Sequence, residues 1–346
     1  MGLDDSYIRG HTQIRRLLAR AAVRDTLPPS LIFSGPDGVG KRQVALALAG
    51  LLNCEGVTSS ANAALATDAA CGECGACQRI HRGVHADVII VEPGDTGAIK
   101  VDQARAVVRQ VAFRPFEGRR RVVVFDDADR LVPEAQNALL RILEEPPPAS
   151  VFLLVTSRPH LLLPTVRSRC PELRFGGVAV DDIATILETW HQRPPAEARA
   201  AAATANGSVA RALESGSAEH VQAQQSAAAV LRDLAAAPNP KRRLAIGKNL
   251  AVARPGSRST AAADRETLTR RIRTLGTFLR DIQVLAVGGE PCGLANADLK
   301  TELAELARSY DPHRAGRGFA SVDRAVYALA RNASPKVVAD WLAQQL

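Results

Sequence analysis

The sequence predicts an α/β N-terminal domain with a parallel sheet, followed by a small helical domain and an all-α C-terminal domain. From residue 31 to residue 175, short apolar runs alternate with segments of helical spacing, a pattern typical of a doubly wound sheet. After Gly176 and Gly177 the strand signals stop, and segments rich in Ala and Leu continue at helical spacing. We therefore expect domains at residues 1–176, 177–220 and 221–346.

Five apolar runs predict the strands of the sheet. The first, third and fourth carry unbroken Val, Ile, Leu and Phe, which suits strands buried on both faces of a parallel sheet. Between the runs, apolar residues recur at helical spacing and predict helices at Lys41–Asn53, Val101–Phe113 and Pro133–Leu143. The expected strands are Leu31–Ser34, Asp87–Val91, Arg121–Phe125, Val151–Thr156 and Glu172–Phe175.

The remaining sequence is expected to be helical. Asp181–His191 and Pro194–Gly207 predict the two helices of a small unit that extends to about residue 217. From about residue 220 to the end the pattern is again helical, with one interruption by a loop at Arg254–Ala263.

Composition narrows the class of protein. Of 346 residues, 46% are hydrophobic and 23% charged, which is ordinary for globular proteins. No apolar run approaches ~18 residues, and the N-terminus opens acidic without a signal-peptide pattern, so we expect a cytoplasmic protein outside membranes. A net charge of +8 permits contact with nucleic acid without requiring it, and an aromatic content of 4% argues against a base-stacking surface.

Residues 35–42 read Gly-Pro-Asp-Gly-Val-Gly-Lys-Arg between an apolar run and a helical segment, the context of a Walker A phosphate-binding loop. Gly35, Gly38 and Gly40 would let backbone N–H groups turn toward an anion, and Lys41 would supply a positive charge for the phosphates of ATP or ADP. The motif should end in Ser or Thr, whose hydroxyl holds Mg²⁺. Arg42 stands there instead and cannot ligate a cation, although it can contact phosphate.

The second half of a nucleotide site follows the Arg121–Phe125 run. Asp126 occupies the Walker B position and would face the metal. A hydrolysing protein normally places Glu next, to polarise the attacking water, whereas Asp127 is one methylene shorter. We therefore expect no efficient hydrolysis by this chain. A vestigial loop that binds no nucleotide is the alternative.

Four cysteines predict a metal site. Cys54 ends the helix after the phosphate loop, and Cys71, Cys74 and Cys77 follow with two-residue spacing. Four thiolates are the ligand set of a closed, structural zinc site, which makes residues 54–77 an inserted zinc module; an iron–sulfur cluster or a redox dithiol is the alternative. The isolated Cys170 and Cys292 are expected to be buried apolar residues.

Several segments together resemble bacterial clamp-loader subunits of the AAA+ class, densely over residues 8–176 and weakly beyond about residue 215. They are the phosphate loop with Asn53 and Cys54, the cysteine cluster, the Asp-Asp-Ala-Asp box at 126–129, Gln136–Leu140, Leu143–Pro147, Thr156–Pro159 and Ser168–Cys170. The resemblance implies an AAA+ P-loop domain, a helical lid and a helical collar. It also implies tau/gamma and delta subunits as partners in a hetero-pentamer that places a sliding clamp on primed DNA.

Three positions distinguish this chain from the motor subunits of that family. The tau/gamma motor typically carries Gly-Lys-Thr, Asp-Glu and Thr-Thr-Asp-Pro, where this sequence has Gly-Lys-Arg, Asp-Asp and Thr-Ser-Arg-Pro. The departures favour a non-motor subunit. An ATP-hydrolysing motor is the alternative, and a zinc-dependent nucleic-acid-binding module is a third hypothesis, weakened by the lack of basic and aromatic residues between the cysteines.

The resemblance also implies roles for single residues. Arg169 in Ser-Arg-Cys is similar to the arginine finger that reaches the ATP of the neighbouring motor subunit, a role that suits a guanidinium supplied in trans. The resemblance assigns no such role to Arg167, two positions earlier, which stays a candidate helper. Thr156 matches the polar sensor after Walker B, and Arg211 matches the second sensor on the lid. Basic runs at 241–243 and 270–273 would belong to the collar.

Overall fold

The computed structural model describes residues 8–56, 70–94, 96–215, 218–237, 239–251, 261–288, 294–296, 299–331 and 333–346. The chain forms two compact units, one of Met1–Ala203 with Gly207–Leu213 and one of Thr204–Asn206 with Glu214–Leu346. Each unit has its own hydrophobic core. In the described part of the chain, no helix combines the length and the hydropathy needed to cross a membrane.

The first unit is built on a five-stranded parallel sheet with the strand order β2-β3-β4-β1-β5. Every residue of β1, β3 and β4 is buried, as expected for strands covered on both faces. The strands are β1 Ser30–Ser34, β2 Val88–Val91, β3 Arg121–Phe125, β4 Ser150–Thr156 and β5 Glu172–Arg174. Each of these bounds lies within one residue of the predicted ones, and the predicted α/β fold class is confirmed.

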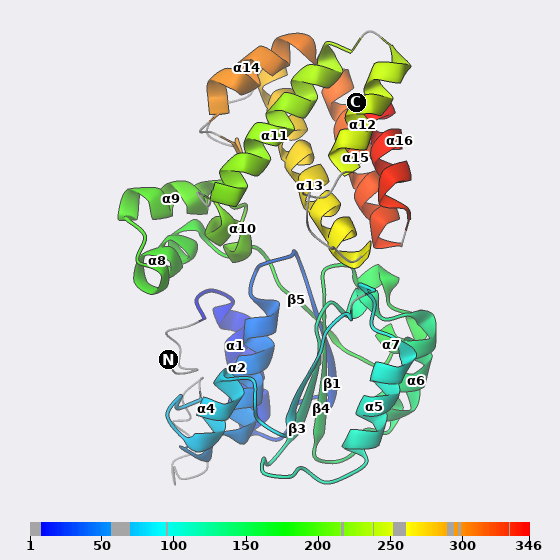
Figure 1. Ribbon diagram of the computed structural model, residues 1–346. Coiled ribbons are helices and arrows are strands. Elements are labelled where there is room, and N and C mark those ends of the chain that lie inside the picture. The colour runs from blue at the N-terminus through cyan, green and yellow to red at the C-terminus, as the bar shows by residue number, and fades with distance from the viewer. Residues whose placement is uncertain are drawn as a thin grey trace. The chain divides into compact units, whose positions relative to one another are not determined.

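Helices cover both faces of this sheet (Figure 1). On one face lie α1 Thr12–Val23, α2 Lys41–Asn53 and α4 Gly75–His81; on the other lie α5 Val101–Val111, α6 Pro133–Glu144 and α7 Pro164–Arg167. Two single turns of 3₁₀-helix, η3 Ala128–Arg130 and η4 Pro159–Leu161, connect β3 to α6 and β4 to α7.

The helix predicted at Val101–Phe113 ends two residues earlier, at Val111. The guanidinium of Arg121 donates hydrogen bonds to the carbonyl oxygens of Gln110, Phe113 and Arg114. Phe113 and Arg114 lie just beyond the helix, so a side chain from the following strand holds the turn into which the chain passes after Val111.

Three further helices follow the sheet, α8 Val180–His191, α9 Pro195–Thr204 and α10 Val209–Glu214. The second of them was expected to continue to Gly207. Instead the chain turns after Thr204, where Asn206 and Gly207 adopt left-handed backbone angles of 50° and 78° in φ. The three-domain division at residues 177 and 221 stays a prediction.

The second unit is helical throughout its described residues (Figure 1). Its core is aliphatic and aromatic, with Ile272, Phe278 and Leu342 fully buried. The predicted loop at Arg254–Ala263 lies mostly outside the described residues, and its last three residues already belong to a helix. The helices are α11 Ala218–Ala235, α12 Pro240–Ala251, α13 Ala261–Ala286, α14 Lys300–Ser309, α15 Pro312–Ala330 and α16 Pro335–Gln345.

Candidate functional site

Parallel strands bring the predicted site residues to one edge of the sheet, because all their carboxyl ends point the same way. Gly35 follows β1, Asp126 follows β3, and Thr156 is the last residue of β4. Glu92, which sequence reasoning did not single out, follows β2 at the same edge. This edge is where open α/β sheets bind ligands.

The phosphate loop has the backbone that the glycines predict. Gly35, Gly38 and Gly40 have φ angles of 147°, 75° and 95°, which L-residues with a side chain rarely adopt. A Cβ on Gly35 would lie 2.3 Å from the carbonyl oxygen of Phe175. Glycine at position 35 is therefore required by both conformation and space.

Lys41 begins α2 and lies inside the loop, with a relative exposure of 6%. Its ammonium donates to the carbonyl oxygens of Gly35 at 2.7 Å and Pro36 at 2.6 Å. Burial lowers the pKa of Lys41, and the nearby carboxylates, first among them Asp37, oppose that shift. A phosphate group entering the loop would compete with the two carbonyl oxygens for this ammonium.

Arg42 bridges two carboxylates at the sheet edge. Its Nη1 donates to Oδ2 of Asp126 at 2.8 Å and also pairs with Glu92. Burial acts to lower the pKa of Arg42, but the charges of Asp126 and Glu92 outweigh it and raise that pKa. A fixed guanidinium thus neutralises Asp126, the carboxylate predicted to face a metal.

Asp127 has a left-handed backbone with a φ of 50°, unusual for a residue other than glycine. Its half-exposed carboxylate lies 3.4 Å from Nε of Arg130. Burial raises the pKa of Asp127, and the charge of Arg130 opposes the shift. The short acid is therefore paired within its own turn of η3.

Thr156 is buried and donates from its hydroxyl to Oδ1 of Asp129 at 2.7 Å. Arg158 donates to Oδ2 of the same carboxylate from Nε at 3.0 Å and from Nη2 at 2.5 Å. The Asp129 side chain is only 2% exposed, and both of its oxygens accept hydrogen bonds, Oδ1 from Thr156 and Oδ2 from Arg158. Sequence reasoning noticed both residues within motifs but did not predict their contact, because nothing in the sequence pairs the two loops.

The loop is also covered from two sides within the first unit. The backbone N–H of Ala210 in α10 donates to the carbonyl oxygen of Gly38 at 3.2 Å. The predicted second sensor, Arg211, is exposed at the next position. On the other side, Nε2 of His11 lies 2.8 Å from the carbonyl oxygen of Val39, a contact that no sequence motif indicates.

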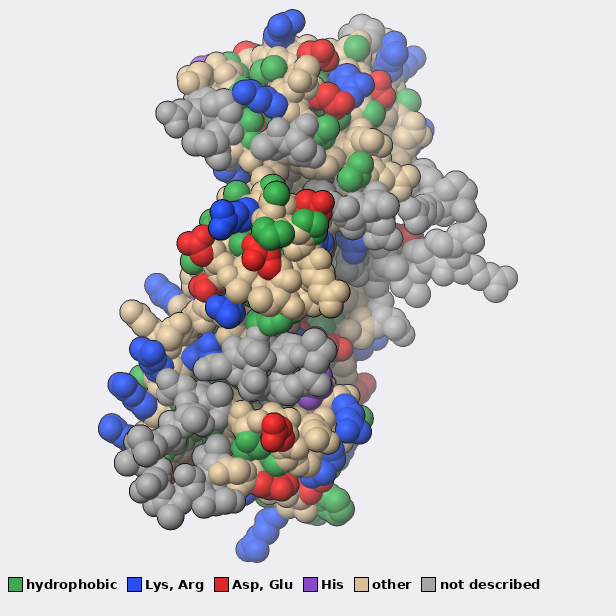
Figure 2. All heavy atoms as spheres, turned by 90° about the vertical axis from the view of Figure 1, so that its left-hand side faces the viewer, with side chains coloured by type: hydrophobic (Ala, Val, Ile, Leu, Met, Phe, Trp, Pro, Cys, Tyr) green, Lys and Arg blue, Asp and Glu red, His purple; other side chains and the backbone are tan. Residues whose placement is uncertain are grey.

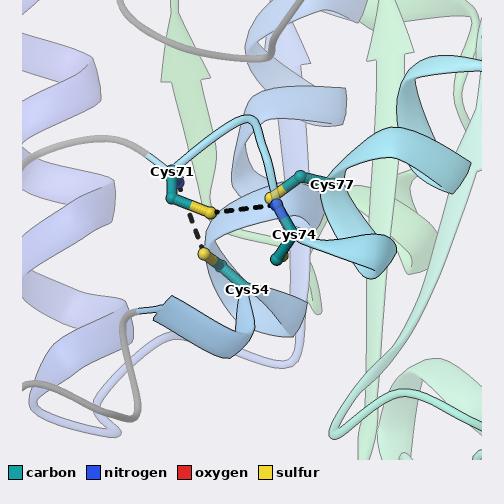
Figure 3. Close-up of side chains that lie close together, drawn as sticks. All are labelled: Cys54, Cys71, Cys74 and Cys77. Carbon is teal, nitrogen blue, oxygen red and sulfur yellow. Dashed lines mark hydrogen bonds between the residues drawn. The ribbon is translucent and has the colours of Figure 1, made fainter.

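The four predicted cysteine ligands come together, with their sulfur atoms all within 4.8 Å of one another (Figure 3). Cys54 caps the C-terminus of α2, Cys74 is the N-cap of α4, and Cys77 lies in that helix. Backbone N–H groups of Cys71 and Cys74 donate to the sulfur atoms of Cys54 and Cys71 at 3.3 and 3.4 Å. Tetrahedral zinc with bonds of ~2.3 Å holds sulfur atoms about 3.8 Å apart, so the cluster fits such an ion after a small contraction.

The thiols of the cluster differ in acidity. Burial acts to raise the pKa of Cys74, but hydrogen bonds from the backbone of Cys77 and Glu55 outweigh it and lower that pKa to about 7. Burial raises the pKa of Cys77. Cys170 is 2% exposed in the core of the first unit, as predicted, and burial raises its pKa to about 11. Cys292 and the segment 57–69 lie outside the described residues.

Arg169 follows α7, more than a hundred residues after the phosphate loop in the sequence. Its guanidinium is 33% exposed and pairs with the carboxylate of Glu144, the last residue of α6. Arg167 is also exposed. Both arginines therefore lie at the surface, where a second chain can reach them.

In Figure 2 several basic side chains follow one another along the left edge of the lower half, whereas blue and red groups are interspersed near the top of this face. Lys241, Arg242, Arg270 and Arg273 are exposed on α12 and α13. The exposure of these basic side chains does not test the predicted collar role of α12 and α13, which stays a prediction.

The family model that matches this chain covers the part that contains the five-stranded sheet. Residues 10–179 match the family model described as "DNA polymerase III, delta subunit". The chain is 40% identical over 140 residues to the DNA polymerase III subunit delta' of Pseudomonas aeruginosa, covering 40% of each chain. It is 34% identical over 166 residues to subunit tau of Bacillus subtilis, covering 48% of this chain and 28% of that one.

A third relative is subunit delta' of Bacillus subtilis, 32% identical over 164 residues, or 47% of this chain and 46% of the relative. The chain thus spans less than half the length of each of these three relatives. The whole of the second unit lies outside the match to the family model.

Proposed function

Because residues 10–179 match the family model described as "DNA polymerase III, delta subunit", we propose that this chain is a delta-prime-type clamp-loader subunit that does not hydrolyse ATP efficiently. The resemblance to clamp-loader subunits is confirmed. In the proposed role the chain joins tau/gamma and delta subunits in a cytoplasmic hetero-pentamer that loads the sliding clamp onto primed DNA. Its own contribution is to the nucleotide site of a neighbouring motor subunit.

One observation carries the loss of hydrolysis: the guanidinium of Arg42 lies between Asp126 and Glu92. In a working site, Mg²⁺ bridges the phosphates, a loop hydroxyl and the Walker B carboxylate. Here the Asp126 carboxylate is already paired with the guanidinium of Arg42. A guanidinium cannot coordinate phosphate oxygens as a metal ion does, and it cannot activate water. Even with nucleotide in the loop, the divalent ion would have to displace an arginine.

Two more contacts support the same conclusion. Asp127, which stands where a hydrolysing protein has Glu, pairs with Arg130 at 3.4 Å. The sensor hydroxyl of Thr156 donates to Asp129, whose other oxygen is held by Arg158. The water-polarising group and the sensor are therefore both engaged by the protein itself. Gly35, Gly38, Gly40 and Lys41 retain the shape that can hold ATP or ADP.

The proposed arginine finger is Arg169. A guanidinium that reaches a neighbour's nucleotide must lie at the surface, and a third of this side chain is exposed. It would stabilise the charge that develops on the transferring phosphoryl group. The four cysteines would hold a structural zinc ion, because four thiolates leave no open position for chemistry.

The finger is tested in the loader reconstituted with its motor and delta subunits, the clamp and primed DNA. Arg169→Ala should lower clamp-stimulated ATP turnover at least about tenfold while the pentamer still assembles, as judged by sizing. Arg141→Ala, at an exposed arginine of α6, serves as the matched control and should cost much less. Unchanged turnover with Arg169→Ala would rule out the finger role.

A tau/gamma-type motor is the second candidate, because the chain is also 34% identical to a tau subunit and retains Lys41 in its loop. Such a motor must turn over ATP by itself with Mg²⁺. The structure favours the first candidate, since Arg42 and Asp127 both lack the chemistry that a motor needs.

A further inference from the structure

The guanidinium of Arg169 is held by three groups of its own chain. Its Nε donates to Oε1 of Glu144 at 2.7 Å, and its Nη2 pairs with the same carboxylate. Its Nη1 donates to the carbonyl oxygen of Thr165 at 2.8 Å and to the hydroxyl of Ser168 at 3.2 Å. All three guanidinium nitrogens therefore have partners within the subunit.

These contacts use the edge of the guanidinium that normally recognises phosphate. Arginine has five N–H donors in a fixed plane, and the Nε–Nη2 edge forms the paired hydrogen bonds typical of carboxylate and phosphate recognition. Glu144 occupies that edge. A phosphate group can bind the same edge only after this carboxylate has left it.

The location of Glu144 argues against a purely structural pair. It is the last residue of α6, where the helix dipole places partial negative charge and disfavours a carboxylate. Both side chains are also substantially exposed, Arg169 by 33% and Glu144 by 47%. Pairs this exposed to water contribute little to stability, so the contact can break at low cost when a stronger anion arrives.

We propose that Glu144 is a positioning residue that holds Arg169 on its own subunit until the phosphates of the neighbouring subunit's nucleotide take the guanidinium from it. This inference rests on the proposed finger role of Arg169. A triphosphate carries more negative charge than one carboxylate, so the exchange proceeds once the neighbour's nucleotide is in place. Glu144 thereby sets the nucleotide concentration at which the finger engages.

The test is Glu144→Gln in the reconstituted loader, which removes the charge and keeps the size. The half-saturating ATP concentration should fall about two- to fivefold, the range expected from a half-exposed ion pair. Turnover at saturating ATP should stay within about twofold, because the finger itself is intact. Glu144→Asp, which keeps the charge, should resemble the wild type. Glu145→Gln, at the next residue, is the control and should also leave half-saturation unchanged.

A double-substitution cycle separates this role from general effects on folding. Binding of a fluorescent ATP analogue to the assembled loader is measured with Glu144→Gln in the wild-type and Arg169→Ala backgrounds. The gain in affinity should appear only where Arg169 is present. The inference is overturned if Glu144→Gln leaves half-saturation unchanged, raises it, or has the same effect in both backgrounds. If Arg169→Ala itself leaves turnover unaffected, the finger role and this inference both fail; if it lowers turnover and Glu144→Gln is silent, only this inference fails.

Discussion

Arg42 shows how one residue can change what a nucleotide site does while its shape is kept. The loop glycines and Lys41 hold their expected conformations, yet the residue after Lys41 joins the loop helix to Asp126 and Glu92. The guanidinium of Arg42 thus places a single positive charge where Mg²⁺ is expected. Nucleotide binding should therefore depend little on Mg²⁺.

We predict that Mg²⁺ does not tighten ADP binding to the purified wild-type chain relative to EDTA. Arg42→Thr restores the hydroxyl and frees Asp126, so Mg²⁺ should then tighten binding by about tenfold or more. Isothermal titration calorimetry with and without Mg²⁺ measures both proteins. Arg109→Thr, at an exposed position of α5, is the control. Tighter wild-type binding with Mg²⁺ would contradict the assigned role of Arg42.

Asp87 is a buried residue whose role sequence reasoning missed. Its side chain is fully buried and pairs with Arg121 at 2.8 Å. Burial alone would raise its pKa, but the backbone N–H groups of Gly118, Glu117 and Phe116 and the guanidinium of Arg121 lower that pKa from 3.8 to about 2. A pKa depressed in the folded state stabilises the fold above the unfolded value, and that stability is lost as pH falls.

Asp87→Asn should therefore lower the free energy of unfolding of the first unit by about 3–5 kcal/mol at neutral pH, because it leaves Arg121 buried without its counter-ion. The difference from the wild type should be constant above the ordinary pKa of 3.8 and should narrow as pH falls toward about 2. Urea unfolding at a series of pH values measures this difference. If the difference in the free energy of unfolding does not change between about pH 2 and pH 3.8, Asp87 is not ionised in the folded protein.

At the scale of elements, the hydrophobic pattern predicted most of the first unit. The strands were placed within a residue because β1, β3 and β4 are buried on both faces and their sequences are continuously apolar. Helix ends were harder. The helix Val101–Val111 ends two residues before the predicted position, and Arg121 of β3 contacts the carbonyl oxygens of the turn that follows it. A periodic pattern contains no information about that contact.

The candidate site was predicted as a set of residues but not as a network. Motif spacing identified Asp126 and Arg42, and the resemblance to clamp-loader subunits identified Thr156 and Arg169. The counter-ions Glu92, Asp129 and Glu144 come from other elements of the sheet unit. Their pairing depends on the strand order β2-β3-β4-β1-β5 and on how the helices pack beside the sheet, which a single sequence does not specify.

The cysteine module is an element whose stability should depend on metal. We predict about one zinc ion per purified chain and its loss in Cys77→Ser, because Cys77 is fully buried and one ligand of four cannot be replaced by water without cost. Plasma emission spectroscopy measures the zinc, and differential scanning fluorimetry should show a lower unfolding temperature. Cys170→Ala, outside the cluster, should keep the zinc. Full zinc content in Cys77→Ser, or iron instead of zinc in the wild-type protein, would contradict the assignment of a zinc site.

At the scale of the whole molecule, the chain consists of two units with separate cores. The second unit has its own buried acid: Asp281, fully buried, accepts hydrogen bonds from the backbone of Ala295 and Asn296 at 3.0 and 2.8 Å. Because the two cores have no residue in common, the units should unfold in separate steps.

Scanning calorimetry should therefore resolve two transitions. Asp87→Asn should lower the temperature of one by several degrees, in line with its larger loss of stability, and Asp281→Asn should lower that of the other for a loss of about 1–3 kcal/mol. One cooperative transition that both substitutions shift equally would show that the units depend on each other for stability.

The central claim is that the chain retains the form of an ATPase domain without the hydrolysis. ATP turnover by the isolated chain with Mg²⁺, compared with its Lys41→Ala variant, tests this most directly. The contacts of Arg42 with Asp126 and of Asp127 with Arg130 predict that the two proteins show the same background rate. Mg²⁺-dependent turnover in the wild type that Lys41→Ala abolishes would contradict the claim and identify the chain as a motor.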